Sequence, residues 1–336
     1  MIDATLRKAL SRAAAVDQDP ASAYVTPHKI VAQTDNGHLM CFGDTSLPPL
    51  LVIYSLVNHP AILDLSPRRS VLGALARGGV CPYLLAWHPP QAARQHLQLA
   101  DYILGDIADA VRWIDQHHQR PPRLLGVCQG GVLALCHAAI APNTLAGLIT
   151  LATPWNNNGE DNRLAQLAQQ IDIPALAAAT SNISGPGLAT LFASLKPFAL
   201  GPLRYNALAD LSDADESELA EFMRMERWMY GGPDLAGAAF VEFTQQIYQN
   251  NALANGTLPL ESFRVSLSDI DIPIFNAYAT QDHLVPPSAA GNLKQAVSGA
   301  VTEMELPGGH LGLFIGRRAH KALYPAMLDW LEKTEA

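Results

Sequence analysis

The chain has 336 residues, with 22 Lys and Arg against 31 Asp and Glu, so its formal net charge is -9. Hydrophobic residues make up 49% of the sequence and charged residues 16%, which allows a large buried core in one large domain or two ordinary ones. An acidic balance without a basic stripe argues against nucleic acid as the main partner.

The first 22 residues are expected to form an amphipathic helix that ends near Asp19-Pro20. They lack the apolar core of a signal peptide, and none of the four cysteines forms a C-x-x-C pair. These features favour a reducing, cytoplasmic location. Two long uncharged runs, 124–159 and 173–195, are interrupted by Gly, Pro and polar residues, so we expect no membrane span.

Short apolar runs alternate with stretches of helical periodicity through the first half of the chain. The predicted strands are 29–34, 38–42, 50–54, 80–87, 123–127 and 145–152. The predicted helices between them are 66–77, 93–118 and 130–141. Because helices separate successive buried strands, the pattern indicates a mostly parallel central sheet with helices on both faces, an α/β fold.

The pattern changes after Thr153. Residues 153–267 hold no convincing buried strand and become helical over 217–230 and 234–250. The alternation then resumes with strand 272–279, helix 288–297, strand 302–306 and helix 319–331. We therefore predict a core formed by residues 1–152 and 268–336, interrupted by an inserted helical cap over 153–267.

The stretch Gly126-Val127-Cys128-Gln129-Gly130-Gly131 connects a predicted strand directly to a predicted helix. It resembles the nucleophile elbow of the α/β-hydrolase fold, with cysteine in place of the usual serine. Gly126 and Gly130 lie two residues on either side of Cys128, where larger side chains would collide in so tight a turn. The resemblance implies an α/β-hydrolase fold with Cys128 as its nucleophile.

Cys128, Asp282 and His310 each follow the carboxyl end of a predicted strand, where ligands bind in such sheets. The order nucleophile, acid, histidine is the order of α/β-hydrolases. His310 would take the thiol proton, and Asp282 would orient the imidazole and stabilise its cation. Two alternatives remain for the acid position: His283 as the working residue, or Asp282 as a turn former.

The oxyanion of the reaction would be bound by backbone N–H groups. We expect one from Gln129 and one from the loop after strand 50–54, where Val57 is favoured and Asn58 is next. The other cysteines, Cys41, Cys81 and Cys136, are interpreted as packing residues. No metal-ligand spacing, phosphate-binding loop or dinucleotide fingerprint occurs, so we expect no metal and no bound cofactor.

A cysteine nucleophile exchanges readily with a thioester and keeps the acyl group activated until an acceptor arrives. The chemistry therefore favours acyl transfer from a thioester over simple hydrolysis, provided that water is excluded. The apolar segment 173–195 is a candidate cover for this purpose.

The chain from about Pro48 to Leu331 resembles the polyhydroxyalkanoate synthases, specifically the short catalytic subunit of the two-subunit types. The segments that carry the resemblance are Tyr54–Asn58, Arg69-Ser70, Gly126–Gly131, Met225–Trp228, Tyr248–Asn251, Asp282–Pro287 and Gly308–Gly312. The resemblance implies polymerisation of (R)-3-hydroxyacyl groups, usually 3-hydroxybutyryl, from coenzyme A thioesters. It makes Cys128 the acylated residue and His310 its base, and it makes Asp282 the carboxylate proposed to help activate the substrate's 3-hydroxyl.

The resemblance further implies a homodimer that pairs with a second synthase subunit on cytoplasmic granules of the product. Two segments depart from the family pattern. Ala86-Trp87-His88 stands where the family usually has Asp-Trp-Gly, and Trp155-Asn156-Asn157 follows Thr153-Pro154 where the family tends to have an aliphatic residue and an aspartate. Two rival functions stay open at this point. One is a thioesterase or polyester depolymerase with the same triad, and the other is a non-enzymatic coat of polymer granules.

Overall fold

The computed structural model describes residues 4–16, 24–196, 206, 208–211, 213 and 215–334. Its largest sheet has eight strands in the order β1-β2-β6-β3-β7-β8-β13-β14. The pairs from β6 to β14 are parallel, whereas β1–β2 and β2–β6 are antiparallel, so the predicted mostly parallel sheet is confirmed. The strands are β1 (Lys29–Gln33), β2 (Gly37–Cys41), β3 (Pro49–Ile53), β6 (Cys81–Trp87), β7 (Arg123–Val127), β8 (Gly147–Leu151), β13 (Ile274–Ala279) and β14 (Val301–Leu306).

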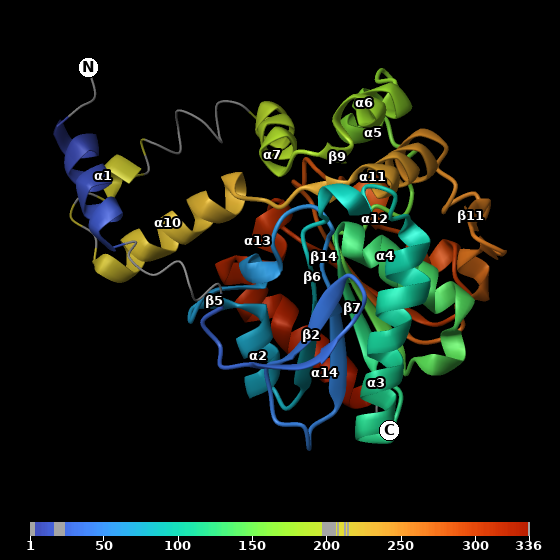
Figure 1. Cartoon of the computed structure of the whole chain (residues 1–336). Coiled ribbons are helices and arrows are strands. Elements are labelled where there is room, and N and C mark those ends of the chain that lie inside the picture. The colour runs from blue at the N-terminus through green and yellow to red at the C-terminus, as the bar shows by residue number, and fades with distance from the viewer. Residues whose placement is uncertain are drawn as a thin grey trace.

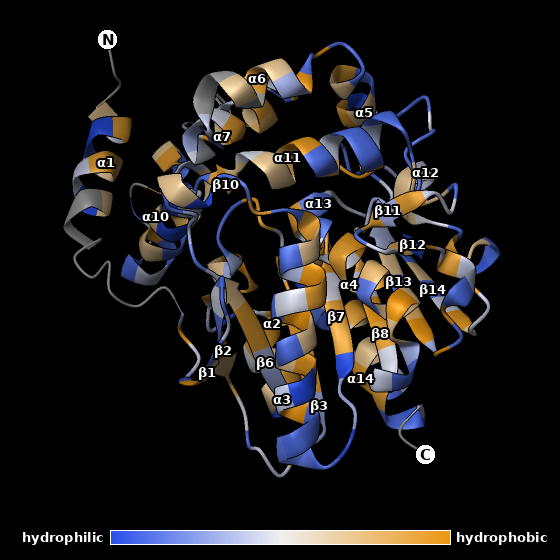
Figure 2. Cartoon of the chain, turned by 45° about the vertical axis from the view of Figure 1, so that its right-hand side comes forward, coloured by the Kyte–Doolittle hydropathy of each residue, from blue (hydrophilic) through white to orange (hydrophobic). Residues whose placement is uncertain are grey.

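Helices cover both faces of this sheet, as Figures 1 and 2 show. One face carries α3 (Ala108–His118) and α4 (Gln129–Ile140), and the other carries α2 (Val71–Arg77) and α14 (Tyr324–Lys333). The remaining elements of this region are η1 (Pro60–Leu63), η2 (Ala92–Arg94), η3 (Asp101–Ile107), η4 (Pro142–Thr144), η6 (Leu267–Asp269), α12 (Pro287–Ala290), η7 (Leu293–Gln295), α13 (His310–Ile315) and η8 (Ala319–Leu323).

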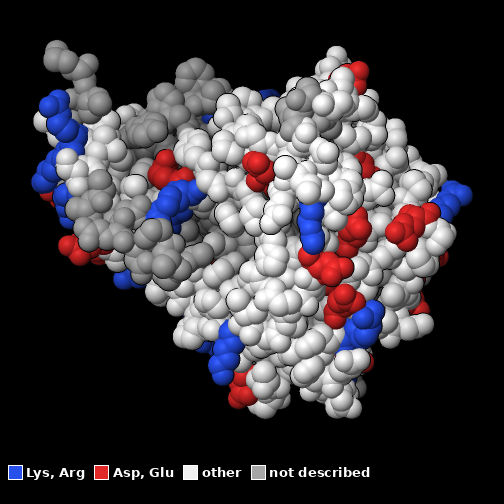
Figure 3. Space-filling model, viewed as in Figure 1, with Lys and Arg blue, Asp and Glu red and all other residues white. Residues whose placement is uncertain are grey.

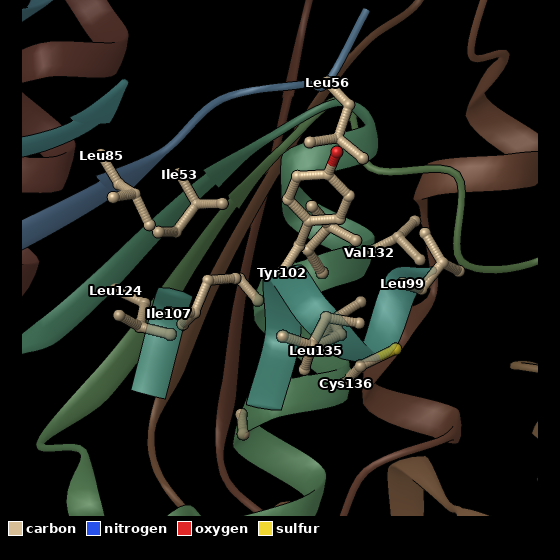
Figure 4. Packing of buried hydrophobic residues seen from close by; sticks show 14 of the residues in the cluster. Ile53, Leu56, Leu85, Leu99, Tyr102, Ile107, Leu124, Val132, Leu135 and Cys136 are labelled. Carbon is tan, nitrogen blue, oxygen red and sulfur yellow. The ribbon is translucent and has the colours of Figure 1, made fainter. Parts of the chain in front are cut away.

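Strand β3 explains why the central strands are apolar throughout. Its side chains alternate between the faces, so Leu51 and Ile53 pack with α3 and α4 while Leu50 and Val52 pack with α2 and α14. A strand buried on both faces therefore needs an unbroken apolar run. Figure 4 shows the first of these clusters, in which Ile53 lies near Leu85 of β6.

Three predicted helices differ from the structure. The predicted helix 93–118 is continuous only from residue 99, because residues 92–94 form the separate turn η2 and residues 95–98 are not helical. The predicted helix 288–297 is two short turns, α12 and η7, because Gly291 leaves the helix and Asn292 adopts a left-handed φ of 60°. The predicted helix 66–77 begins only at Val71, where the Ser70 hydroxyl caps it. The residues before it form a ribbon of β4 (Asp64–Ser66) and β5 (Arg69–Ser70).

Residues 153–267 supply the helices that lie beyond the carboxyl ends of the parallel strands (Figures 1 and 2). Their helices are α5 (Arg163–Ala168), α6 (Ile173–Thr180), α7 (Gly185–Ser194), α10 (Glu216–Tyr230), α11 (Gly237–Phe243) and η5 (Thr244–Gln249). Helix α10 and the pair α11–η5 match the predicted helices. The sequence did not predict two short ribbons outside the main sheet, β9 (Asn182–Ile183) with β10 (Leu235–Ala236) and β11 (Leu258–Leu260) with β12 (Phe263–Val265).

Helix α1 (Ala4–Val16) lies against α10, away from the main sheet, with Ala9 and Ala13 packed on Leu219 (Figure 1). The rest of the predicted helix 1–22 lies outside the described residues. Acidic and basic side chains are scattered over the face shown in Figure 3, with wide uncharged areas between them. Within the described parts of the chain, no helix has the length and apolar character needed to cross a membrane.

Candidate active site

Cys128 occupies a sharp bend between β7 and α4. Its backbone has φ 54° and ψ -122°, an unusual conformation for a residue other than glycine. A Cβ on Gly130 would lie 2.3 Å from the Ile53 carbonyl oxygen, and one on Gly126 would lie 2.4 Å from Gly131 Cα. The two glycines are therefore required by close packing, as the sequence predicted, and they let the thiol emerge at the N-terminus of α4.

Asp282 and His310 meet although 28 residues separate them in the sequence. His310 Nδ1 lies 2.6 Å from Asp282 Oδ2, and the Asp282 side chain is fully buried. The other carboxylate oxygen, Oδ1, accepts hydrogen bonds from the N–H groups of Leu284 and Val285 at 2.9 and 3.0 Å. Asp282 thus both forms the turn after β13 and holds the imidazole of His310, which begins α13.

The charges of this pair stabilise each other. Burial raises the pKa of Asp282, but the His310 charge and hydrogen bond outweigh it, and the pKa is lowered overall. Burial lowers the pKa of His310, but the charges of Asp282 and Cys128 and its hydrogen bonds to both side chains raise that pKa well above its usual value. The arrangement therefore favours an imidazolium on His310 beside the Asp282 carboxylate.

Cys128 and His310 line the same pocket, which is open to solvent. Its walls are mainly apolar and come from the helices beyond the sheet, including Leu167, Leu188, Phe192 and Phe240. Within the segment 173–195, which the sequence suggested as a cover, α7 supplies Leu188 and Phe192. Such walls suit an apolar acyl group.

The two residues predicted to donate N–H groups to the oxyanion, Gln129 and Val57, both line this pocket. The Val57 N–H, however, already has an acceptor, the side chain of Gln129, which the sequence did not reveal. Gln129 is the first residue of α4, so its N–H has no acceptor within the helix. The Gln129 side-chain oxygen Oε1 accepts the N–H of Leu56 at 2.9 Å and that of Val57 at 3.4 Å. The side chain of Gln129 therefore ties the loop after β3 to the elbow, and Asn58 lines the same pocket.

Two tyrosines near the thiol were missed by the sequence analysis. Tyr54 and Tyr248 both line the pocket, and the pKa of each is raised, first by burial and then by the charge of Cys128. Tyr54 directly follows β3, so its place at the carboxyl edge of the sheet was a usable signal. Tyr248 lies in η5 and opens the segment Tyr248–Asn251, which carries part of the family resemblance, but nothing in the sequence placed it beside Cys128.

The remaining candidates lie apart from this group. His283 does not pair with the carboxylate. The pKa of His283 is lowered to about 4, mainly by burial. Its Nδ1 has no hydrogen-bond partner among the described residues. Cys136 is fully buried in α4, as expected of a packing residue. The described residues contain no group of three or more His, Cys, Asp or Glu side chains that could hold a metal ion.

Residues 86–316 match the family model of the alpha/beta hydrolase fold. The chain is 39% identical over 287 residues to the poly(3-hydroxyalkanoate) polymerase subunit PhaC of Allochromatium vinosum, a match that covers 85% of this chain and 81% of that protein. It is 32% identical over 333 residues to the PhaC subunit of a Synechocystis species, which covers 95% of this chain and 88% of that protein.

A solved structure, the monoacylglycerol lipase of Paleococcus ferrophilus, is similar in fold. Its TM-score is 0.54 at 17% sequence identity, and the match covers 89% of this chain and 99% of the lipase. At this identity the likeness supports the α/β-hydrolase fold alone.

Proposed function

Because this chain belongs to the family of poly(3-hydroxyalkanoate) polymerase PhaC subunits, on an α/β-hydrolase fold, we propose that it polymerises (R)-3-hydroxyacyl groups from coenzyme A thioesters. The observation that carries this proposal is a thiol, rather than a hydroxyl, at the elbow beside the His310–Asp282 pair. We take 3-hydroxybutyryl-CoA as the substrate to test first.

In the first step His310 takes the proton of the Cys128 thiol, and the sulfur attacks the thioester carbonyl carbon. The new bond joins that carbon to Sγ, and the bond to the sulfur of coenzyme A breaks. Coenzyme A leaves with a proton from His310. The oxyanion formed on the way is bound by the backbone N–H of Gln129 and by one from the loop after β3, that of Val57 or Asn58; the Val57 N–H would first have to leave Gln129 Oε1, which lies 3.4 Å away. The product is an acyl group held on Cys128 as a thioester.

In the second step a 3-hydroxyl oxygen of another unit attacks the same carbon. His310 takes the hydroxyl proton, a new ester bond forms, and the Cys128 sulfur leaves. Because the acyl group arrives and waits as a thioester, the reaction needs no bound cofactor. The apolar pocket supports transfer to a hydroxyl over loss to water, since water would end the chain.

Asp282 acts on His310 in this mechanism and does not touch the substrate. One of its oxygens is engaged by two backbone N–H groups and the other by the imidazole. The carboxylate therefore fixes the tautomer with Nε2 free to exchange protons with Cys128 and with the incoming hydroxyl.

We further propose that the protein forms a homodimer, pairs with a second synthase subunit and works in the cytoplasm at the surface of polymer granules. The PhaC relatives are named as subunits, which supports a partner. The cap is proposed to be residues 153–267, with 1–152 and 268–336 forming the core.

The test is to incubate the purified protein with 3-hydroxybutyryl-CoA, alone and with a candidate partner subunit, and to measure both coenzyme A release and polymer. We expect polymer to account for the released coenzyme A. Free 3-hydroxy acid in step with coenzyme A, without polymer, would instead identify a thioesterase. A Cys128→Ala variant whose function at polymer granules is unchanged would identify a non-enzymatic granule coat.

A further inference from the structure

Two thiols that the proposed reaction does not use lie next to each other in the main sheet. Cys41 ends β2 and Cys81 begins β6, and their sulfur atoms are 3.6 Å apart. Both side chains are buried, at 7% and 0% exposure. The sequence analysis interpreted each one separately as a packing residue, because nothing local connects positions 41 and 81.

The backbone around the pair holds the two sulfurs on one face of the sheet. Cys41 lies opposite Tyr83 in the antiparallel pairing of β2 with β6, so Cys81 is its diagonal neighbour. The chain continues from Cys41 to Gly43, where an added Cβ would lie 3.1 Å from Cys81 Cα. A disulfide S–S bond is about 2.05 Å long, so the sulfurs need to approach by only about 1.5 Å.

The surroundings of Cys41 favour its reactive form. The pKa of the Cys41 thiol is lowered to about 6, first by its hydrogen bond with Cys81, against the opposing effect of burial. The charge of Lys29 acts in the same direction. The pKa of Cys81 is raised, first by the same hydrogen bond. One thiol of the pair is therefore suited to attack and the other to keep its proton until the second step.

We propose that Cys41 and Cys81 form a reversible disulfide when the protein meets a low-molecular-weight disulfide such as oxidised glutathione. The Cys41 sulfur attacks one sulfur of the small disulfide, breaks its S–S bond and releases one small thiol. Cys81 then attacks Cys41 in the mixed disulfide, forms the internal bond and releases the second small thiol. Two protein thiols are oxidised, one small disulfide is reduced, and the two S–H protons leave on the two small thiols.

The bond would tie the edge hairpin β1–β2 covalently to the parallel part of the sheet. Cys81 is at the first residue of β6, whereas the reacting groups follow the carboxyl ends of the strands. The disulfide therefore forms at the opposite edge from Cys128, and it closes a loop that restricts the unfolded chain. We expect oxidation to raise the melting temperature by several degrees without blocking the site. This inference does not depend on the proposed reaction.

The test uses the Cys128→Ala variant, which leaves three of the four cysteines. After treatment with oxidised glutathione, the thiol count in denaturant should fall from three to one and return to three with dithiothreitol. Tryptic digestion should release peptides 30–68 and 78–94 as one linked species, because each contains one cysteine. The same linked species should appear in the wild-type protein, which guards against a folding defect in the variant.

Two further variants in the same background complete the design. Cys136→Ser should keep the linked peptides, because Cys136 takes no part. Its count of free thiols should fall from two to zero on treatment with oxidised glutathione. Cys81→Ser should instead stop at a glutathione on Cys41. Three surviving thiols, or a glutathione that stays on Cys41 while Cys81 is present, would overturn the proposal.

Discussion

Replacing Asp282 by Asn is the sharpest test of how the site works. The amide oxygen can still accept the N–H groups of Leu284 and Val285, so the turn after β13 is kept. The amide nitrogen then faces His310 Nδ1 in place of a carboxylate oxygen. An N–H donor at this position favours the tautomer in which Nε2 carries the proton, and such an imidazole cannot take a proton from Cys128 or the substrate.

The size of the effect follows from the contact that is lost. A hydrogen bond of 2.6 Å to a charged partner with a fully buried side chain is worth about 1.5 to 3 kcal/mol. At 1.36 kcal/mol for each tenfold change in rate, this loss alone slows turnover roughly 10- to 150-fold. The inverted tautomer adds to it, so we expect turnover to fall by about 10²- to 10³-fold.

The assay is coenzyme A release from 3-hydroxybutyryl-CoA, followed both as the first rapid release and in the steady state. Because Asp282 acts through His310, both phases should slow together. Asp329→Asn is the matched control, since Asp329 pairs with Lys333 on the exposed side of α14 and should leave both phases unchanged.

A different outcome would refute the reasoning. If the first release keeps its wild-type rate and only later turnover is lost, Asp282 serves the incoming hydroxyl and not the thiol. If both phases keep more than about a third of the wild-type rate, the 2.6 Å contact has no role in turnover.

Three other predictions follow from the same geometry. Cys128→Ser should lower coenzyme A release by several orders of magnitude, because a hydroxyl is a poor nucleophile toward thioesters at neutral pH, and near wild-type polymer yield would contradict this. Gly130→Ala should lower the free energy of unfolding by about 2–3 kcal/mol in urea titrations, because its Cβ would lie 2.3 Å from the Ile53 oxygen. Gly105→Ala is the control: its Cβ meets open space and the residue lies within a helix, so it should leave the free energy of unfolding unchanged or raise it by up to about 1 kcal/mol. The wild-type protein should exceed Asp282→Asn in free energy of unfolding by most between roughly pH 4 and 6.5. The lowered pKa of Asp282 gives stability that is lost as pH falls, and the raised pKa of His310 gives stability that is lost as pH rises. A difference independent of pH would exclude the ion pair as its source.

Most of the sheet could be predicted because its signals are local. A strand buried on both faces must be apolar at every position, and β3 reads as such a run in five consecutive residues. The elbow was equally visible, because the bend at Cys128 leaves no space for side chains at Gly126 and Gly130. The break at Gly291-Asn292 within the predicted helix 288–297 was harder to predict, since Gly and Asn also occur near the ends of helices that continue past them.

The sequence by itself determined the fold class, the elbow around Cys128 and the chain order of Cys128, Asp282 and His310, because glycine spacing and apolar runs are local signals. Only the tertiary structure decided that the imidazole beside Asp282 is that of His310 and not that of His283. It also decided that the Gln129 side chain accepts a hydrogen bond from the Val57 N–H. It alone also brought Cys41 to Cys81. These contacts join residues 28, 72 and 40 positions apart, and their distances depend on how whole strands pair and twist. No local pattern carries that information.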